Sequence, residues 1–364
     1  MKVGTLTFHR AINLGAVLQA YALSEYIKKT GNECDIIDYR CEYIENHYKK
    51  SKFFANGIKG AVVHLLCDGH DAERKKKFSE FSDKYLPVSK KAYTENDLKT
   101  ANQSYDKFIT GSDQVWNYAV ADFDKAYFLD FVTDSKKKLS YAASFGFDKI
   151  PEDKETDYYN LLNDFNHISV REASAVDIVK DLASKDATQV LDPVFLLSAD
   201  DWNKLTEKDE PKEKYILIYA FCVTENILKK AQELSNATGY KIYGITFIIK
   251  PLKGLKQINA VGPLDFLNLI KNAEFVVTNS FHGTAFSIIY NKKFFVEYYK
   301  LDVCINARFD SILGITGLEN RCISNFDTGL LDTIDYDAVN EKLDEERKKS
   351  YDFLKKVIGN NEQN

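Results

Sequence analysis

The chain has 364 residues, of which 45% are hydrophobic and 28% are charged. This composition is typical of a soluble globular protein, and the length exceeds one ordinary hydrophobic core, so we expect about two domains. The formal net charge of −5 argues against a general nucleic-acid-binding protein.

The N-terminal residues and the cysteines favour the cytoplasm. The stretch MKVGTLTFHR lacks the long apolar core of a signal peptide, and no apolar run reaches the length of a membrane span. The six cysteines are scattered without a C-x-x-C pair, which predicts reduced thiols. Because metal-ligating residues do not cluster, we expect neither a tightly bound metal nor a cofactor.

The first half of the chain alternates between strand and helix patterns. Strand patterns occupy 2–8, 34–39, 105–113, 139–146 and 167–172. Helix patterns follow the first and the last of these, and Asn13 can cap the first helix. Such alternation is typical of a parallel sheet. Residues 190–197 are expected to close this half.

The second half repeats the alternation. Strand patterns occupy 215–221, 241–246, 274–280 and 292–298, with helix patterns between them. We therefore predict an α/β protein with two doubly wound domains facing each other. The expected units are 1–197, 198–335 and a C-terminal helical tail, 336–364.

A basic segment interrupts the first half. Residues 47–91 carry eleven Lys/Arg against five Asp/Glu, including RKKK at 74–77. The favoured interpretation is a solvated helical face. The alternative is a surface that contacts an anionic membrane or a phosphate-bearing acceptor.

Ligands of doubly wound sheets bind beyond the carboxyl ends of the strands, so the residues after each strand are the candidates. After the first strand, Asn13 and Gly15 can form a cap, a ligand loop or both, and neither G-x-G-x-x-G nor a P-loop is present.

In the segment 111–117, Asp113 and Gln114 suit sugar hydroxyls and Trp116 offers a flat face to a sugar ring. The alternative is a capped helix start.

Two further strand ends carry groups that suit an anion. Arg171 can grip a carboxylate or phosphate, although an ion pair with Glu172 is the commoner fate of such a residue. Ser280 and His282 precede a helix that begins at Gly283 and Thr284, and a helix N-terminus favours anions. His282 can move a proton near neutral pH, although a lone histidine is more often structural.

Two residues outside these strand ends complete the set. Arg308 is expected to add a second basic contact from the C-terminal half. Asp192 and Pro193 form a turn expected to position the crossing between the domains.

The ordered set of segments resembles the polysaccharide pyruvyl transferase family. The resemblance runs over nearly the whole chain and is weakest in 45–100. The matching pieces are NLGAVLQAYAL (13–23), ITGSDQVWN (109–117), SYAASFG (140–146), SVRE (169–172), LDPVF (191–195), NSFHGTAFSIIYNKKFF (279–295) and NARFDSIL (306–313).

The resemblance implies two Rossmann-like domains facing a cleft, as in GT-B glycosyltransferases, with the acceptor on the N-terminal side and the donor on the C-terminal side. It also implies transfer of a pyruvyl group from phosphoenolpyruvate to two hydroxyls of a sugar or lipid-linked oligosaccharide, giving a cyclic ketal and phosphate. The expected residues are His282 and Asp113 for catalysis, Arg171, Ser280, Gly283, Thr284 and Arg308 for the donor, and Asn13, Gln114 and Trp116 for the acceptor.

One departure concerns the donor. Characterised members carry a motif similar to Arg-Leu-His where this chain has Ser280-Phe281-His282. The histidine carries over and the arginine does not, so a donor-phosphate contact is missing unless Arg308 or Arg10 replaces it. This difference puts the donor's identity in question more than the fold.

Two other functions are compatible with this fold. A GT-B-like glycosyltransferase would use a nucleotide sugar, but the chain has no convincing nucleotide-binding signature. A non-catalytic carbohydrate-binding protein would keep the cleft without turnover. An NAD-dependent oxidoreductase is disfavoured because the glycine fingerprint is missing.

Overall fold

The computed structural model describes residues 1–49, 57–206, 213–246, 254–298, 306–324 and 329–359. The side chains of 47–49 and 57–69 lie outside this description. The predicted basic contact surface, 47–91, therefore falls partly outside the described residues. Within the described part, Lys77 pairs with Asp265 at 2.9 Å and Arg74 donates to the carbonyl of Ile12, so both cations hold this segment against the rest of the molecule.

The N-terminal half is built on a parallel five-stranded sheet in the order β3-β2-β1-β4-β5. Its strands are β1 (Lys2–Leu6), β2 (Glu33–Tyr39), β3 (Val88–Tyr93), β4 (Lys107–Thr110) and β5 (Lys138–Ser140). Single bridges join Leu139 to His167 and Ala143 to Val170. They connect the β5 edge to the parallel pair β6 (Ile168–Val170) and β7 (Ala187–Gln189).

The C-terminal half has a second parallel sheet of the same topology, in the order β10-β9-β8-β11-β12. Its strands are β8 (Tyr215–Ala220), β9 (Lys241–Thr246), β10 (Leu255–Gln257), β11 (Phe275–Thr278) and β12 (Lys293–Val296). All six residues of β8 are buried, as expected for a central strand covered on both faces.

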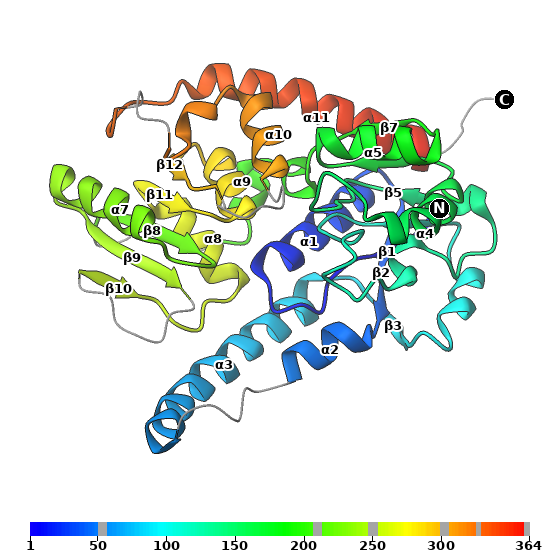
Figure 1. The fold of residues 1–364 in the computed structure, drawn as a ribbon, viewed down its shortest axis with the longest axis horizontal. Coiled ribbons are helices and arrows are strands. Elements are labelled where there is room, and N and C mark those ends of the chain that lie inside the picture. Colours follow the sequence, from blue (N-terminus) through cyan, green and yellow to red (C-terminus); the bar gives the residue numbers. More distant parts are fainter. Residues whose placement is uncertain (50–56, 207–212, 247–253, 299–305, 325–328, 360–364) are drawn as a thin grey trace.

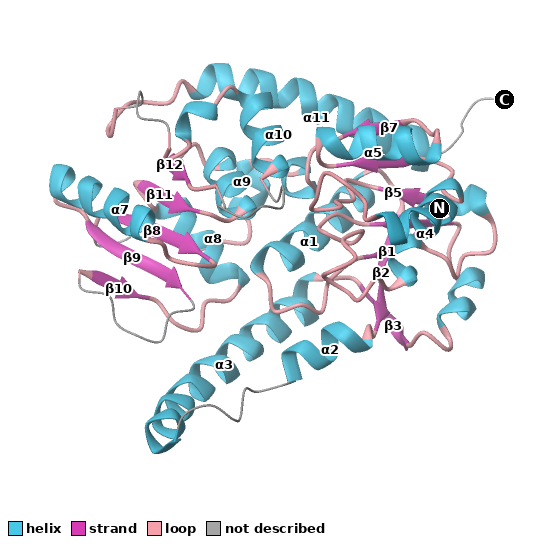
Figure 2. Ribbon diagram, viewed as in Figure 1, coloured by secondary structure: helices cyan, strands magenta, loops and turns pink. Residues whose placement is uncertain are grey.

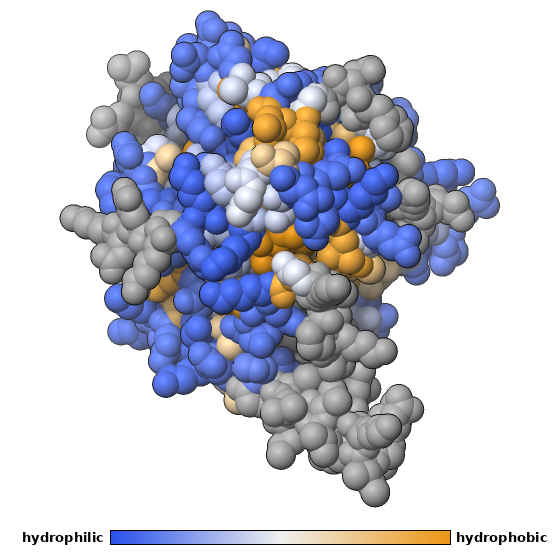
Figure 3. All heavy atoms as spheres, turned by 90° about the vertical axis from the view of Figure 1, so that its left-hand side faces the viewer, coloured by the Kyte–Doolittle hydropathy of each residue, from blue (hydrophilic) through white to orange (hydrophobic). Residues whose placement is uncertain are grey.

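Helices surround both sheets (Figures 1 and 2). They are α1 (Leu14–Lys29), α2 (Glu42–Lys49), α3 (Gly57–Tyr85), α4 (Glu155–Asn163), α5 (Ala173–Ala183), α6 (Ala199–Asn203), α7 (Glu225–Thr238), α8 (Pro263–Asn272), α9 (Phe281–Ile289), α10 (Ala307–Thr316) and α11 (Tyr336–Ile358). The face at the α7 and β10 end is mainly hydrophilic around a smaller apolar area (Figure 3).

Local sequence signals explain where several helices begin and end. The Asn13 side chain accepts hydrogen bonds from the backbone N–H groups of Gly15 and Ala16 and caps α1, as predicted. Thr224 caps α7 in the same way, and Gly239 ends that helix in the left-handed conformation at φ 74°.

The topology places the candidate residues. In each sheet the strand order reverses beside one central strand, between β1 and β4 in the first sheet and between β8 and β11 in the second. Ligands of doubly wound sheets bind in the crevice at such a switch point. Asn13 follows β1, Asp113 follows β4 and His282 follows β11, so all three lie at switch points.

The two halves share apolar contacts. One core cluster joins Leu14 and Leu18 of α1 to Phe286 and Ile289 of α9, together with Val194 of the connecting segment. A buried interface of this kind positions the carboxyl ends of the two sheets relative to each other.

The C-terminal helix α11 contacts both halves and runs across them in Figure 1. Near its start, Val339 and Leu343 join the cluster that contains α9, and near its end Phe353 and Leu354 pack with the first sheet. The hydroxyl of Ser350 accepts from the backbone N–H of Leu191 at 3.0 Å. The second half of α11 therefore packs into the core of the N-terminal half.

The sequence patterns did not predict three of the observed strands, β3, β7 and β10. The sequence VSKKAY did not suggest a strand because Ser89, Lys90 and Lys91 are polar, and β3 is an edge strand, where such residues are common. The strand expected at 139–146 is also shorter, since Ala142 has a φ of 51° and turns the chain away after β5.

Leu354→Ala should lower the free energy of unfolding by about 2–5 kcal/mol, because it removes a fully buried side chain from the core of the N-terminal half. The neighbouring exposed residue gives the control, and Lys355→Ala should stay within about 0.5 kcal/mol of the wild type. Urea unfolding of both variants measures the difference. Equal stabilities would show that α11 is a loosely attached tail.

Candidate active site

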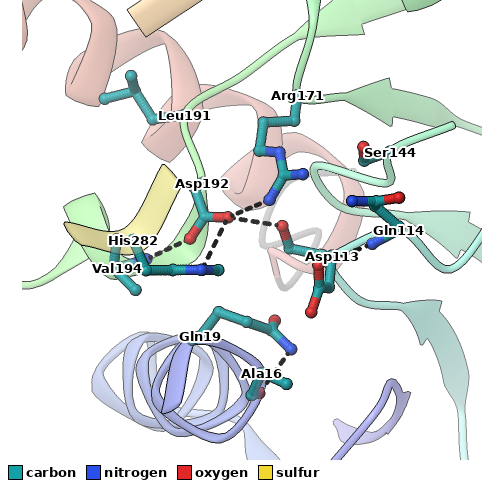
Figure 4. Close-up of polar contacts among 12 residues, drawn as sticks. Ala16, Gln19, Asp113, Gln114, Ser144, Arg171, Leu191, Asp192, Val194 and His282 are labelled. Carbon is teal, nitrogen blue, oxygen red and sulfur yellow. Dashed lines mark hydrogen bonds and ion pairs between the residues drawn. The ribbon is translucent and has the colours of Figure 1, made fainter. Parts of the chain in front are cut away.

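Asp192 is the centre of a buried polar cluster between the two halves (Figure 4). Its Oδ2 accepts a hydrogen bond from the hydroxyl of Ser112 at 2.9 Å and from Nη1 of Arg171 at 2.9 Å. Nε2 of His282 lies 3.8 Å from the same oxygen. The other carboxylate oxygen accepts from the backbone N–H of Val194. One carboxylate thus links three elements of the N-terminal half to the histidine of α9.

Arg171 brings a buried cation to this cluster. Nε of Arg171 donates to Glu172 at 3.2 Å, and Glu172 also accepts from the hydroxyl of Ser144 at 2.5 Å. The guanidinium carbon lies 4.5 Å from the ring centre of Phe281, which belongs to the C-terminal half. Burial lowers the pKa of Arg171, but Glu172 and Asp192 outweigh it, so the net pKa is raised and the charge is kept.

His282 packs directly against the first turn of α1. A Cβ added at Gly15 would lie 1.9 Å from Nδ1 of His282, so only glycine fits there. The sequence left a ligand loop at Gly15 open, and the group that lies against this glycine is the imidazole of His282. Burial lowers the pKa of His282, the carboxylates of Asp192 and Asp113 raise it, and the cations of Arg171 and Arg308 lower it further.

Two of these charges come from other expected site residues, the guanidinium of Arg308 and the carboxylate of Asp113. Arg308 belongs to α10, and its charge acts on His282 together with that of Arg171. Arg10, the other arginine considered for the donor, instead pairs with Asp38 and Glu45.

Four buried side-chain atoms of the described residues have no hydrogen-bond partner and belong to residues at or beside this cluster: Gln19 Oε1, Arg171 Nη2, Glu172 Oε2 and His282 Nε2. Buried polar atoms are nearly always satisfied in folded proteins. These atoms are therefore the groups that can bind polar atoms of a ligand, and they include both donors and acceptors.

A second part of the site is a pocket of about 320 Å³ at the carboxyl ends of β1 and β4. Asn13, Asp113 and Gln114 line it, so the structure brings together three residues that the sequence assigned to sugar chemistry. Asp113 has a φ of 79° and its Oδ1 accepts from the backbone N–H of Gln114. Such left-handed conformations are uncommon outside glycine and recur at functional sites.

The prediction that Trp116 offers a face to a sugar needs correction. The side chain is fully buried, and its ring stacks on Phe128 at 5.6 Å and contacts Phe145 and Phe165. Its indole N–H donates to the carbonyl of Tyr127. Trp116 therefore stabilises the N-terminal core and has no free face for a ligand.

The expected anion site at the start of α9 is engaged in internal contacts. The hydroxyl of Ser280 accepts from the backbone N–H of Gly283 at 3.4 Å and caps the helix. A Cβ at Gly283 would lie 2.4 Å from Oγ1 of Thr278, so this glycine makes room for β11 rather than for a ligand. The Thr284 hydroxyl donates to the carbonyl of Ser280. Of this segment, His282 and the ring of Phe281 contact the cluster.

Sequence reasoning missed two residues of the site. Asp192 was interpreted as a turn residue, and its side chain does cap a short helix, Pro193–Leu196, but the same carboxylate also binds Arg171. Gln19 lies among buried apolar neighbours of α1, and its Nε2 donates to Thr7 at 2.8 Å. An amide in an otherwise apolar helical face is the signal that would have identified Gln19.

The described residues have three further properties. No group of three or more His, Cys, Asp or Glu residues is placed to hold a metal ion. Among the helices described, none combines the length and hydropathy of a membrane span. Cys34, Cys41, Cys222 and Cys322 are free thiols.

Comparisons with known proteins agree with this architecture. Residues 13–300 match the family described as polysaccharide pyruvyl transferase. A UDP-GlcNAc 2-epimerase from Methanocaldococcus jannaschii, solved with UDP-GlcNAc and UDP, is similar in structure with a TM-score of 0.50 and 14% identity, over 98% of this chain and 99% of that chain. The glycosyltransferase SsfS6 from Streptomyces sp. SF2575 gives 0.39 and 12%, over 98% and 99%.

No curated protein matches the chain in sequence. The family match covers most of the chain, and the UDP-GlcNAc 2-epimerase with a TM-score of 0.50 has a similar fold. The predicted family and the predicted fold class, an α/β protein of two Rossmann-like domains, are both confirmed. The chain belongs to the polysaccharide pyruvyl transferase family.

Proposed function

We propose that this protein transfers a pyruvyl group from phosphoenolpyruvate to two hydroxyls of a sugar, in a polysaccharide or its lipid-linked precursor, and releases phosphate. The observation that carries the proposal is the meeting of Arg171 and His282 at Asp192. A cation and a proton-transferring group from opposite halves of the molecule lie at one buried point. Membership of a transferase family agrees with it.

The reaction needs one proton donor and one proton acceptor. Protonation of the methylene carbon breaks the carbon–carbon double bond and leaves an electron-poor carbon, which the first hydroxyl attacks with loss of its proton. The second hydroxyl then forms the second carbon–oxygen bond as the bond to phosphate breaks. Of the two hydroxyl protons, one returns to the acid that protonated the methylene carbon. The other is taken up by the phosphate that leaves.

His282 is the proposed proton donor. Burial favours the neutral imidazole, because the protein interior penalises the charged form. Phosphoenolpyruvate carries a carboxylate and a phosphate, and negative charge beside the ring raises its pKa. Donor binding would therefore help to charge the imidazole at the stage when a proton is required.

Asp192 is a positioning residue in this scheme. Its carboxylate fixes the guanidinium of Arg171 and lies on the Nε2 side of the imidazole, while Gly15 borders the Nδ1 side. The ring is thereby held between α1 and the buried carboxylate. The unpartnered Nη2 of Arg171 is the proposed contact for the donor's carboxylate or phosphate.

Asp113 is the proposed acceptor of a hydroxyl proton, and Asn13 and Gln114 would orient the sugar in the 320 Å³ pocket. Arg308 is the proposed replacement for the arginine that the family motif has at position 280. Arg308 acts electrostatically on His282, whereas Arg10 is paired elsewhere.

The first test is phosphate release from phosphoenolpyruvate with a panel of sugar acceptors. His282→Gln should lower turnover by about 10²–10⁴-fold, the usual contribution of a general acid. His70→Gln, at an exposed position, is the matched control. The proposal is wrong if the folded wild-type protein releases no phosphate with any acceptor of the panel but releases nucleotide from a sugar nucleotide. That result would indicate a glycosyltransferase.

The coupling between Asp192 and His282 can be measured by NMR titration of the imidazole. The midpoint in the wild type should lie below the ordinary histidine value of about 6.5 because the ring is buried. Asp192→Asn should lower it further, since the carboxylate favours the protonated ring. Ser112→Ala keeps that charge and serves as the control. A midpoint that rises in Asp192→Asn would contradict the assigned role.

Arg308→Gln should raise the KM for phosphoenolpyruvate about tenfold or more and leave kcat less affected, because a hydrogen bond to a charged group is worth about 1.5–3 kcal/mol. Lys349→Gln on the exposed side of α11 is the control for lost positive charge. Steady-state kinetics with varied donor concentration separates the two constants. An unchanged KM would exclude Arg308 from the donor site.

A further inference from the structure

We propose that a polar groove beside the acceptor pocket binds further sugar units of a neutral or amine-bearing saccharide chain, with Tyr43 as the aromatic platform between pocket and groove. The groove is about 1100 Å³ in volume and lies at the carboxyl ends of β2 and β3. This inference deepens the proposed function, because it assigns the chemical class of the acceptor and the direction in which its chain continues.

Tyr43 connects the two hollows. It lines both the 320 Å³ pocket that holds Asn13, Asp113 and Gln114 and the larger groove. Tyr43 lies in the first turn of α2 and is 44% exposed. It offers an apolar ring and a polar hydroxyl, the combination that suits the face and the rim of a sugar.

The volumes fit a chain better than a single sugar. The smaller pocket is near the lower end of the range for small-ligand sites, roughly 300–1,000 Å³, and the groove exceeds that range. Since the pocket holds the proposed reacting hydroxyls, the groove has room for the sugars that follow. An exposed apolar residue at the pocket, Val120, adds to the surface that a ring can cover.

The charge of the groove decides which chains it accepts. Its lining has three more carboxylic acids than basic side chains. Two of those cations are paired with carboxylates outside the lining, Arg40 with Asp38 and Lys125 with Asp157. One of the acids, Glu45, is likewise paired with Arg10, which lies outside the lining. The carboxylates can accept hydrogen bonds from sugar hydroxyls and attract amines, whereas they repel chains that carry carboxylate or phosphate. The acids are Glu42, Glu45, Glu95, Asp122, Asp124 and Asp130, and the bases are Arg40, Lys99 and Lys125.

The test measures binding without donor, by calorimetry with three series of oligosaccharides of increasing length: glucose, glucosamine and galacturonate oligomers. The affinity of the wild type should rise with length for the glucose and glucosamine series and stay weak for the galacturonate series. Added salt should reduce the difference between the last two series.

Tyr43→Ala should weaken binding of the longer glucose oligomers about tenfold, equivalent to about 1.4 kcal/mol. Tyr159→Ala, at an exposed tyrosine on α4 that lines neither hollow, is the matched control and should bind as the wild type does. The double variant Glu95→Gln/Asp122→Asn should narrow the gap between glucosamine and galacturonate oligomers, and Asn tolerates the φ of 52° at position 122.

Three outcomes would overturn the inference: no binding of any series, affinity independent of length, or equal effects of Tyr43→Ala and Tyr159→Ala. Preferred binding of galacturonate would overturn the charge assignment. Failure of the pyruvyl transfer assay with length-dependent binding intact would instead reject the proposed reaction and leave the groove as a glycan site.

Discussion

The buried carboxylate of Asp192 is the constraint on which the site depends. It has little access to water, so its charge must be compensated by the protein, and Arg171 and Ser112 provide that compensation. Removing one partner of such a buried pair typically costs about 3–5 kcal/mol. Oδ2 of Asp192, which accepts both hydrogen bonds, also faces His282. The groups that compensate the carboxylate charge therefore also determine where the imidazole contacts the N-terminal half.

The two parts of the site differ in their charges. Charges of both signs act on the imidazole, the carboxylates of Asp192 and Asp113 and the cations of Arg171 and Arg308. The lining of the groove beyond Tyr43 is mainly acidic. In the proposed function, the two guanidinium groups would bind the small acidic donor, and the carboxylates of the groove would repel it.

Much of the architecture followed from local patterns, because periodicity and caps act over a few neighbouring residues. Asn13 caps α1, and the strand–helix alternation predicted four of the five strands in each sheet. The failures concern contacts between distant segments. Trp116 looked like a ligand platform beside polar neighbours, but residues 128, 145 and 165 bury it. Asp192 resembled a turn residue, because its pairing with Arg171 spans 21 positions.

The path of α11 limits how the enzyme can move. Its 23 residues form a continuous helix whose two ends belong to different hydrophobic clusters. At about 1.5 Å per residue, this helix is roughly 35 Å long, and it connects the two halves as a rigid element. A hinge motion that separates the two sheets would have to bend α11 or detach one of its ends. Small sliding displacements of the two halves are therefore the less costly way to admit substrates.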